Sequence, residues 1–293
     1  MAFTQPRYLV STDWLAASLD DPSLRILDAT VFLRPPSPDA PRTAWVRESG
    51  RKQWEAGHIP GSAFADLIHD LSDQTAELPF MLPPAAQFAA AMGALGVGPG
   101  TRVICYDAAG TMWAARLWWM LRAYGFDDVA VLDGGWKKWT LEGCPVSTDP
   151  PSYPPATFQA VLRPAFVATR EDVLAAIGDG AACIVNALAP EQHRGDGPAV
   201  YGRPGRIASS VNVPARDLTD PETGAFLPAD VLRERFADVG ATDAGRVITY
   251  CGGGIAATAD ALVLALLGHE NVAVYDGSMS EWGRDPSLPM EVG

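Results

Sequence analysis

The chain repeats itself once at long range, and this repeat limits the folds it can adopt. Residues 103–110 (VICYDAAG) match residues 247–254 (VITYCGGG) at a constant offset of 144 positions, the distance from Asp107 to Cys251. Other matching segments are separated by a number of positions that differs from 144, which indicates that the connecting loops differ in length between the two copies while the elements are the same. A chain of 293 residues with one such repeat is predicted to form two similar domains, because a solenoid needs shorter and more numerous units.

Apolar segments in both copies alternate between strand-like and helix-like patterns, in the same order. The expected helices are 12–19, 85–95 and 112–123 in the first copy and 170–177, 229–239 and 255–267 in the second. The expected strands are 24–27, 102–106 and 129–132 in the first copy and 182–185, 246–250 and 271–275 in the second. This alternation predicts an α/β fold with two tandem domains, each a parallel sheet with helices on both faces.

Prolines concentrate between the two copies. Six of them fall within residues 145–164, which is too many for an element of a folded core. We therefore expect a first domain at 1–144, a proline-rich linker at 145–165 and a second domain at 166–293.

The charge and hydropathy of the chain argue against two classes of partner. Its net charge of −13 disfavours nucleic acid and anionic membrane surfaces, since both attract basic proteins. No apolar stretch reaches the roughly 18 residues that span a bilayer, and residues 1–11 lack the pattern of a signal peptide. The sequence therefore predicts a cytoplasmic protein without a nucleic-acid or membrane partner.

The four cysteines lie far apart in the sequence, without the paired spacing of a disulfide framework or a zinc site. Cys105 and Cys183 lie inside apolar strand-like segments, so we expect them to pack in a core. Cys144 follows a glycine in a loop. Cys251 differs from all three, because it stands where a strand ends, three glycines follow and a helix begins.

The surroundings of Cys251 are those of a nucleophile. Successive glycines let backbone N–H groups turn toward the sulfur, and the following helix directs its positive end at the same place. Both effects favour the thiolate, the reactive form of cysteine. Asp107 occupies the corresponding position in the first copy, so only the second copy is expected to carry a catalytic cysteine.

Together with the tandem repeat, the cysteine loop and the paired Asp-Gly…Trp endings, the segment Gly57-His58-Ile59-Pro60-Gly61 resembles the two-domain rhodanese-like sulfurtransferases. The resemblance covers essentially the whole chain. It implies that Cys251 takes sulfur from thiosulfate or 3-mercaptopyruvate and carries it as a persulfide. It also implies that the following residues bind substrate as a cradle: Gly252, Gly253, Gly254, Ile255 and Ala256.

The same resemblance implies that no metal and no organic cofactor takes part. The acceptor is expected to be a thiol or cyanide, with a thioredoxin-like protein as one candidate. The donor is expected to be a small anion, held by arginines of the loop that corresponds to the family's substrate-binding loop: Arg194, Arg203 and Arg206. The family's own arginine in this region aligns with Gln192. Relatives that prefer 3-mercaptopyruvate have a hydroxyl residue where this chain has Gly253, so the preferred donor stays open.

Two other classes of function use a similar loop or the same fold. A cysteine-dependent phosphatase of the Cys-x5-Arg type needs arginine where this chain has Ala257, which argues against phosphatase chemistry. A non-enzymatic sulfur-relay or protein-binding module of the same fold is the alternative, and the retained Cys251 and its glycines argue for catalysis. The acceptor and the oligomeric state are not determined by the sequence.

Overall fold

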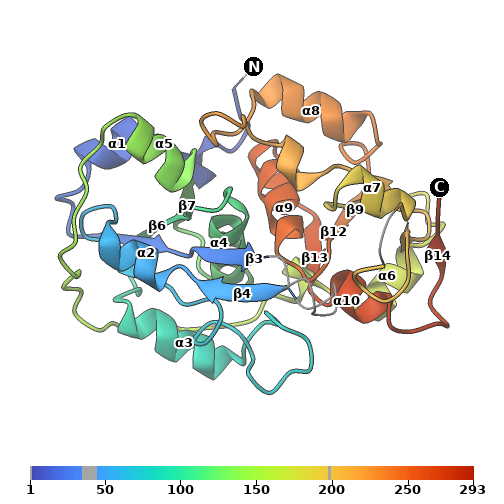
Figure 1. Ribbon diagram of the computed structural model, residues 1–293, viewed down its shortest axis with the longest axis horizontal. Helices are drawn as coiled ribbons and strands as arrows, with labels where there is room; N and C mark the ends of the chain where they lie inside the picture. Colours follow the sequence, from blue (N-terminus) through green and yellow to red (C-terminus); the bar gives the residue numbers. More distant parts are fainter. Residues whose placement is uncertain (1, 35–44, 197–198) are drawn as a thin grey trace.

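Two domains of similar architecture lie side by side in the computed structural model, which describes residues 2–34, 45–196 and 199–293 (Figure 1). The strands of the first domain are β1 (Leu9–Val10), β2 (Leu24–Asp28), β3 (Val31–Arg34), β4 (Val46–Ser49), β5 (Ala63–Phe64), β6 (Arg102–Tyr106) and β7 (Val129–Leu132). Its helices are α1 (Thr12–Ala17), α2 (Arg51–Ala56), α3 (Ala85–Ala94), α4 (Met112–Ala123) and α5 (Gly135–Leu141).

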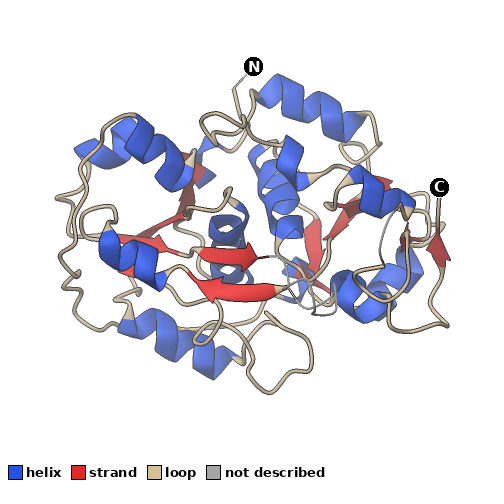
Figure 2. Ribbon diagram, viewed as in Figure 1, coloured by secondary structure: helices blue, strands red, loops and turns tan. Residues whose placement is uncertain are grey.

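The second domain repeats this plan. Its strands are β8 (Val167–Ala168), β9 (Ala182–Asn186), β10 (Arg206–Ile207), β11 (Val211–Asn212), β12 (Arg246–Tyr250), β13 (Val272–Tyr275) and β14 (Met290–Glu291). Its helices are α6 (Arg170–Ala176), α7 (Pro190–Arg194), α8 (Ala229–Ala237), α9 (Ala256–Leu266) and α10 (Ser278–Trp282). Helices flank the sheets of both domains (Figure 2).

Each domain is built on a 5-stranded sheet, and the equivalent strands follow the same order in both sheets. The order is β1-β7-β6-β2-β5 in the first domain and β8-β13-β12-β9-β11 in the second, and every pair is parallel. β6 and β12 therefore occupy the middle of their sheets, where parallel strands are covered on both faces. The predicted fold class, with two tandem domains of parallel strands and flanking helices, is confirmed.

The long, apolar elements match their predicted positions, and 102–106, 112–123, 129–132 and 246–250 agree at both ends. The sequence pattern missed the shorter elements. These include the two-residue strands β1, β5, β8 and β11 and the antiparallel pairs β3–β4 and β10–β14. Two residues are too few to display an alternating pattern, so the edges of both sheets were not predicted.

The repeated residues make the same contact in both domains. The Tyr106 hydroxyl lies 2.9 Å from the Ser62 hydroxyl, and the Tyr250 hydroxyl lies 2.8 Å from that of Ser210. Each tyrosine ends the central strand of its sheet, just before Asp107 or Cys251. The pairs anchor the strand ends from which the two loops start.

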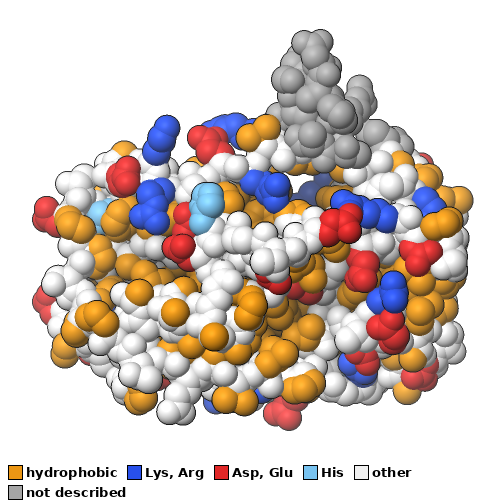
Figure 3. All heavy atoms as spheres, turned by 90° about the horizontal axis from the view of Figure 1, so that it is seen from below, with side chains coloured by type: hydrophobic (Ala, Val, Ile, Leu, Met, Phe, Trp, Pro, Cys, Tyr) orange, Lys and Arg blue, Asp and Glu red, His pale blue; other side chains and the backbone are white. Residues whose placement is uncertain are grey.

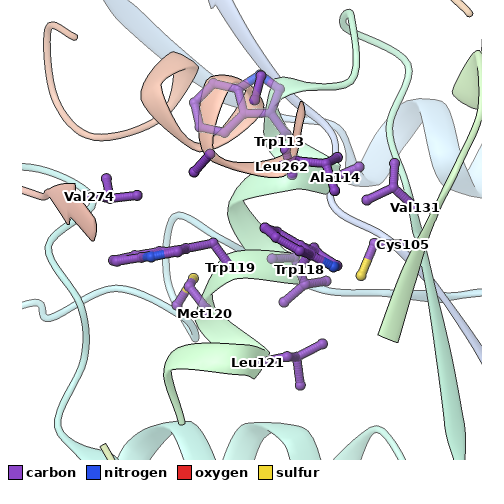
Figure 4. Close-up of a cluster of buried hydrophobic side chains, with 14 of the residues drawn as sticks. Cys105, Trp113, Ala114, Trp118, Trp119, Met120, Leu121, Val131, Leu262 and Val274 are labelled. Atoms are coloured by element: carbon purple, nitrogen blue, oxygen red, sulfur yellow. The ribbon is translucent and has the colours of Figure 1, made fainter. Parts of the chain in front are cut away.

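Helices α4 and α9 pack against each other at the centre of the molecule, one from each domain (Figure 1). Trp113, Trp118 and Trp119 of α4 are buried in one apolar cluster with Leu262 and Val274 of the second domain (Figure 4). The tryptophans of α4 thus contribute both to the first core and to the seam between the domains. The cluster joins the two domains through apolar burial.

Residues 148–163 contain no helix or strand, but they lie along the first domain. The Ala156 N–H donates to the Gly93 carbonyl at 2.9 Å, and the Val161 N–H donates to the Tyr124 carbonyl at 3.1 Å. The linker is therefore fixed to the first domain by backbone hydrogen bonds. The exact domain boundaries stay a prediction.

The surface carries both signs of charge. On the underside of the molecule, Lys and Arg side chains are interspersed with Asp and Glu side chains around a partly apolar hollow (Figure 3). Across the three described ranges, no helix combines the length and the hydropathy required to cross a bilayer.

Candidate active site

Cys251 follows the central strand β12 directly and is only 3 % exposed. The loop 251–255 then leads into α9, whose first residue is Ala256. No side chain caps this helix start. The cysteine therefore stands at the carboxyl edge of a parallel sheet, beside the positive end of a helix, as the sequence predicted.

Ser278 fixes the shape of the loop. Its hydroxyl accepts the N–H groups of Cys251 and Gly254, each at 3.1 Å, and donates to the Tyr275 carbonyl at 2.7 Å. Ser278 has a φ of 49°, a left-handed conformation that is rare for a side-chain-bearing residue. The corresponding residue of the first domain is Gly135, whose φ is 52°. The second domain thus retains the backbone turn and adds a hydroxyl to it.

In the first domain, the loop equivalent to 251–255 surrounds the side chain of Asp107. Oδ1 of Asp107 accepts the N–H groups of Ala109 at 2.7 Å and Thr111 at 3.0 Å. Oδ2 accepts those of Trp113 at 3.0 Å and Ala114 at 2.8 Å. Burial raises the pKa of Asp107, and the four N–H groups oppose that rise. Four backbone N–H groups around the start of α4 therefore converge on the Asp107 carboxyl.

Three of the four equivalent amides in the second domain have no acceptor in the described part of the chain. Offset by 144, the four donors correspond to Gly253, Ile255, Ala257 and Thr258. The Thr258 N–H bonds the Ile255 carbonyl at 3.0 Å, whereas the N–H groups of the other three have no acceptor within the described part of the chain. Three amides at the start of α9 are thus available to an anion attached to Cys251.

The first domain also supports the loop directly. Nη1 of Arg116, a buried residue of α4, donates to the Gly254 carbonyl at 3.1 Å and to Oδ1 of Asp276 at 2.5 Å. Oδ2 of Asp276 accepts the Leu82 N–H at 2.8 Å. Gly254 has a φ of 73°, and a Cβ there would lie 2.6 Å from Asp276, so a glycine is required. Both domains therefore determine the loop geometry.

The three predicted arginines already have partners. Arg194 is exposed and pairs with Asp196 at 2.9 Å. The Arg203 guanidinium donates to four backbone carbonyls of the C-terminal segment, those of Trp282, Gly283, Asp285 and Leu288. Arg206 pairs with Glu291 at 3.2 Å. Residues 197 and 198 of this stretch lie outside the described residues. Donor binding by these arginines stays a prediction.

The other three cysteines are also free thiols, and their surroundings disfavour the thiolate. Burial raises the pKa of Cys105 well above its ordinary value and that of Cys183 to about 11. Burial, aided by Glu142 and Asp13, also raises the pKa of Cys144. Within the described ranges, no group of three or more His, Cys, Asp or Glu side chains is placed to hold a metal ion.

Sequence reasoning missed Ser278, Asp276 and the loop contact of Arg116. Ser278 had a faint signal, because it follows the repeated Asp-Gly pair where the first copy has a second glycine. The Arg116 contact had none, since it crosses from one domain to the other.

Comparison with known proteins agrees with this architecture. The family described as "Rhodanese-like domain" matches residues 11–142 and 169–285. Thiosulfate sulfurtransferase of Rattus norvegicus is 37% identical over 287 residues, covering 95% of this chain and 92% of the relative. 3-Mercaptopyruvate sulfurtransferase of Homo sapiens is 36% identical over 284 residues, covering 94% and 92%. The crystal structure of SseA from Escherichia coli, a 3-mercaptopyruvate sulfotransferase, superposes with a TM-score of 0.79 at 33% identity, covering 92% of this chain and 98% of that chain.

Proposed function

The chain belongs to the rhodanese-like family and is a sulfurtransferase, and we propose that Cys251 is the residue that carries the sulfur. The enzyme moves sulfane sulfur from thiosulfate or 3-mercaptopyruvate to a thiol or cyanide. Relatives named for either donor are almost equally similar to this chain, at 37% and 36% identity. Overall similarity therefore does not select the donor.

The reaction proceeds in two displacements at sulfur. The Cys251 thiolate attacks the outer sulfur of the donor, an S–S bond forms, and the bond to the rest of the donor breaks. The electron pair of that bond leaves with sulfite or with the enolate of pyruvate. An acceptor thiolate or cyanide then attacks the terminal sulfur of the persulfide, and Cys251 departs as thiolate.

The single observation that supports a persulfide at Cys251 is the way the first domain holds Asp107. In an aspartate, each charged oxygen lies two bonds beyond Cβ. In a cysteine persulfide, the charged terminal sulfur also lies two bonds beyond Cβ. The three unoccupied amides of Gly253, Ile255 and Ala257 would therefore receive the terminal sulfur as the equivalent amides receive Asp107.

We assign donor binding to the same loop, with Gly252, Gly254 and Ala256 completing the backbone path around the sulfur. Among the predicted arginines, Arg194 fits this role best, because its partner Asp196 is itself exposed and both can turn in solvent. A thioredoxin-like acceptor and a cytoplasmic location remain predictions.

The experiment that tests the proposal compares serine variants of all four cysteines. We expect Cys251→Ser to abolish sulfur transfer and the variants at Cys105, Cys144 and Cys183 to retain it. Intact mass spectrometry after brief incubation with donor should find one added sulfur atom, held at Cys251 and removed by cyanide. Substantial turnover by Cys251→Ser would refute the assignment, and turnover without any sulfur adduct would favour direct transfer.

A further inference from the structure

The side-chain hydroxyls packed around the cysteine loop are committed to the backbone. The hydroxyl of Ser278 donates to the Tyr275 carbonyl, that of Ser280 to the Gly252 carbonyl and that of Thr258 to the Ile255 carbonyl, each at 2.7 Å. A hydroxyl whose hydrogen is held by a carbonyl is a poor source of a proton for a substrate. None of these three is therefore available to the reaction.

Tyr201 is the exception. Its phenol lies directly against the loop, since a Cβ added to Gly252 would stand 2.1 Å from the phenolic oxygen and 2.2 Å from Cζ. Only a glycine at position 252 admits the ring at this place. The hydroxyl has no hydrogen-bond partner in the portion of the chain that is described, and the residue is half-buried. Its hydrogen is thus free to point at a bound substrate.

The electrostatics of the site keep this phenol protonated. Burial, and then the negative charge of nearby Cys251, raise the pKa of Tyr201 to about 12. At neutral pH the side chain is therefore an O–H donor and not a base.

Resting on the proposed function, we propose that Tyr201 is the acid that protonates the departing half of a carbon–sulfur donor. When Cys251 attacks the sulfur of 3-mercaptopyruvate, the electron pair of the C–S bond passes into the enolate of pyruvate. The phenolic proton is transferred to that enolate, and the tyrosinate regains a proton from water. Sulfite, the group that leaves thiosulfate, departs as a stable anion and requires no proton.

This difference between donors gives the test. We expect Tyr201→Phe to lower kcat/KM for 3-mercaptopyruvate by about a hundredfold, with most of the loss in kcat, the usual size of a lost general acid. The same variant should lose less than about threefold with thiosulfate. Tyr153→Phe is the matched control, because its hydroxyl bonds Ile26 and Gly61 of the first domain, and we expect unchanged kinetics.

The loop offers a second, independent check. A Cβ at Gly253 would meet only the Ser280 hydroxyl, at 3.8 Å, so a serine fits there without displacing a neighbour. Adding Gly253→Ser to the Tyr201→Phe variant should raise kcat/KM for 3-mercaptopyruvate at least tenfold above that of Tyr201→Phe alone. This rescue would not occur if the phenol served only to pack the loop.

Three outcomes overturn the proposal: equal losses with both donors, unchanged kinetics in Tyr201→Phe, or a parent enzyme that accepts thiosulfate alone. Each of them leaves the proposed function standing as long as Cys251 still forms its sulfur adduct. Loss of that adduct in the parent protein would instead refute the proposed function itself.

Discussion

Asp260 of α9 is a carboxyl group buried without compensation. It is fully buried, and neither of its oxygens has a hydrogen-bond partner within the described residues. Burial raises its pKa well above the ordinary value, because the charged form has no donor or cation to stabilise it. The folded protein therefore holds a proton that the unfolded chain releases above about pH 4.

This residue predicts a stability that falls with rising pH. The contribution of Asp260 is fully present below its unfolded pKa of about 4 and is lost as pH rises toward the folded pKa, at about 1.4 kcal/mol per pH unit. We expect Asp260→Asn to remove this dependence. Urea unfolding should therefore find that the stability of the variant relative to the parent increases from pH 5 to pH 8, and that the variant is the more stable protein at pH 8. The exposed Asp149→Asn is the control. Parallel pH curves for parent and Asp260→Asn would contradict the argument.

We predict different roles for Arg194 and Arg203. We expect Arg194→Ala to lower kcat/KM for the better donor by roughly ten- to a hundredfold, the size of one lost charge-assisted contact, without a change in stability. Arg203→Ala should instead lower the free energy of unfolding by about 2–4 kcal/mol, because four carbonyls lose their donor. Kinetics and urea unfolding of both variants check this. Normal kinetics in Arg194→Ala would place the anion site elsewhere.

At the scale of elements, the sequence predicts what depends on local pattern. β6 and β12 are buried apolar segments bounded by clear signals, and their positions agree at both ends. The edge strands β5 and β11 have two residues each and exist only because a neighbouring strand offers hydrogen bonds. No local pattern could have located them.

The candidate site divides in the same way. Cys251 and its glycines form one continuous segment, so the sequence alone could propose them as the site. Tyr201, Ser278 and Arg116 approach that segment from three other elements, and only the folded chain brings them there. Arg203 resembles an anion ligand in the sequence, yet its partners are carbonyls roughly eighty residues further on.

Ser278 allows backbone strain and loop support to be measured separately. Ser278→Ala leaves the N–H groups of Cys251 and Gly254 without an acceptor and keeps a strained φ. Ser278→Gly loses the same hydroxyl but relieves the strain, so we expect it to be about 1 kcal/mol more stable than Ser278→Ala. Both variants should lose activity equally, because the loop is loosened in both. Steady-state kinetics and urea unfolding provide the two readouts, and full activity in either variant would show that the hydroxyl is dispensable.

At the scale of the molecule, the two domains exchange equivalent hydrogen bonds. Asp133 of the first domain accepts the Phe226 N–H at 2.8 Å, and Asp276 of the second accepts the Leu82 N–H at 2.8 Å. Leu82 and Phe226 are themselves related by the offset of 144. The repeat is therefore preserved as an approximate twofold relation, in which each domain holds a main-chain segment of the other. Arg116 breaks the symmetry at the one loop that carries the cysteine.

The fixed aspartate of the first domain bears on how the protein should respond to heat. Asp107 accepts four amides of its own domain without any ligand. Under the proposed function, the three free amides near Cys251 gain an acceptor only when the cysteine carries sulfur. Loading with sulfur should then stabilise the second domain as Asp107 stabilises the first, and hydrogen bonds to one charge would raise the melting temperature by roughly 3 °C or more. Calorimetry of thiosulfate-treated and cyanide-treated protein measures this, with Cys251→Ser as the form that should not respond. If the shift is found, the melting temperature of this enzyme is a gauge of how much sulfur it carries.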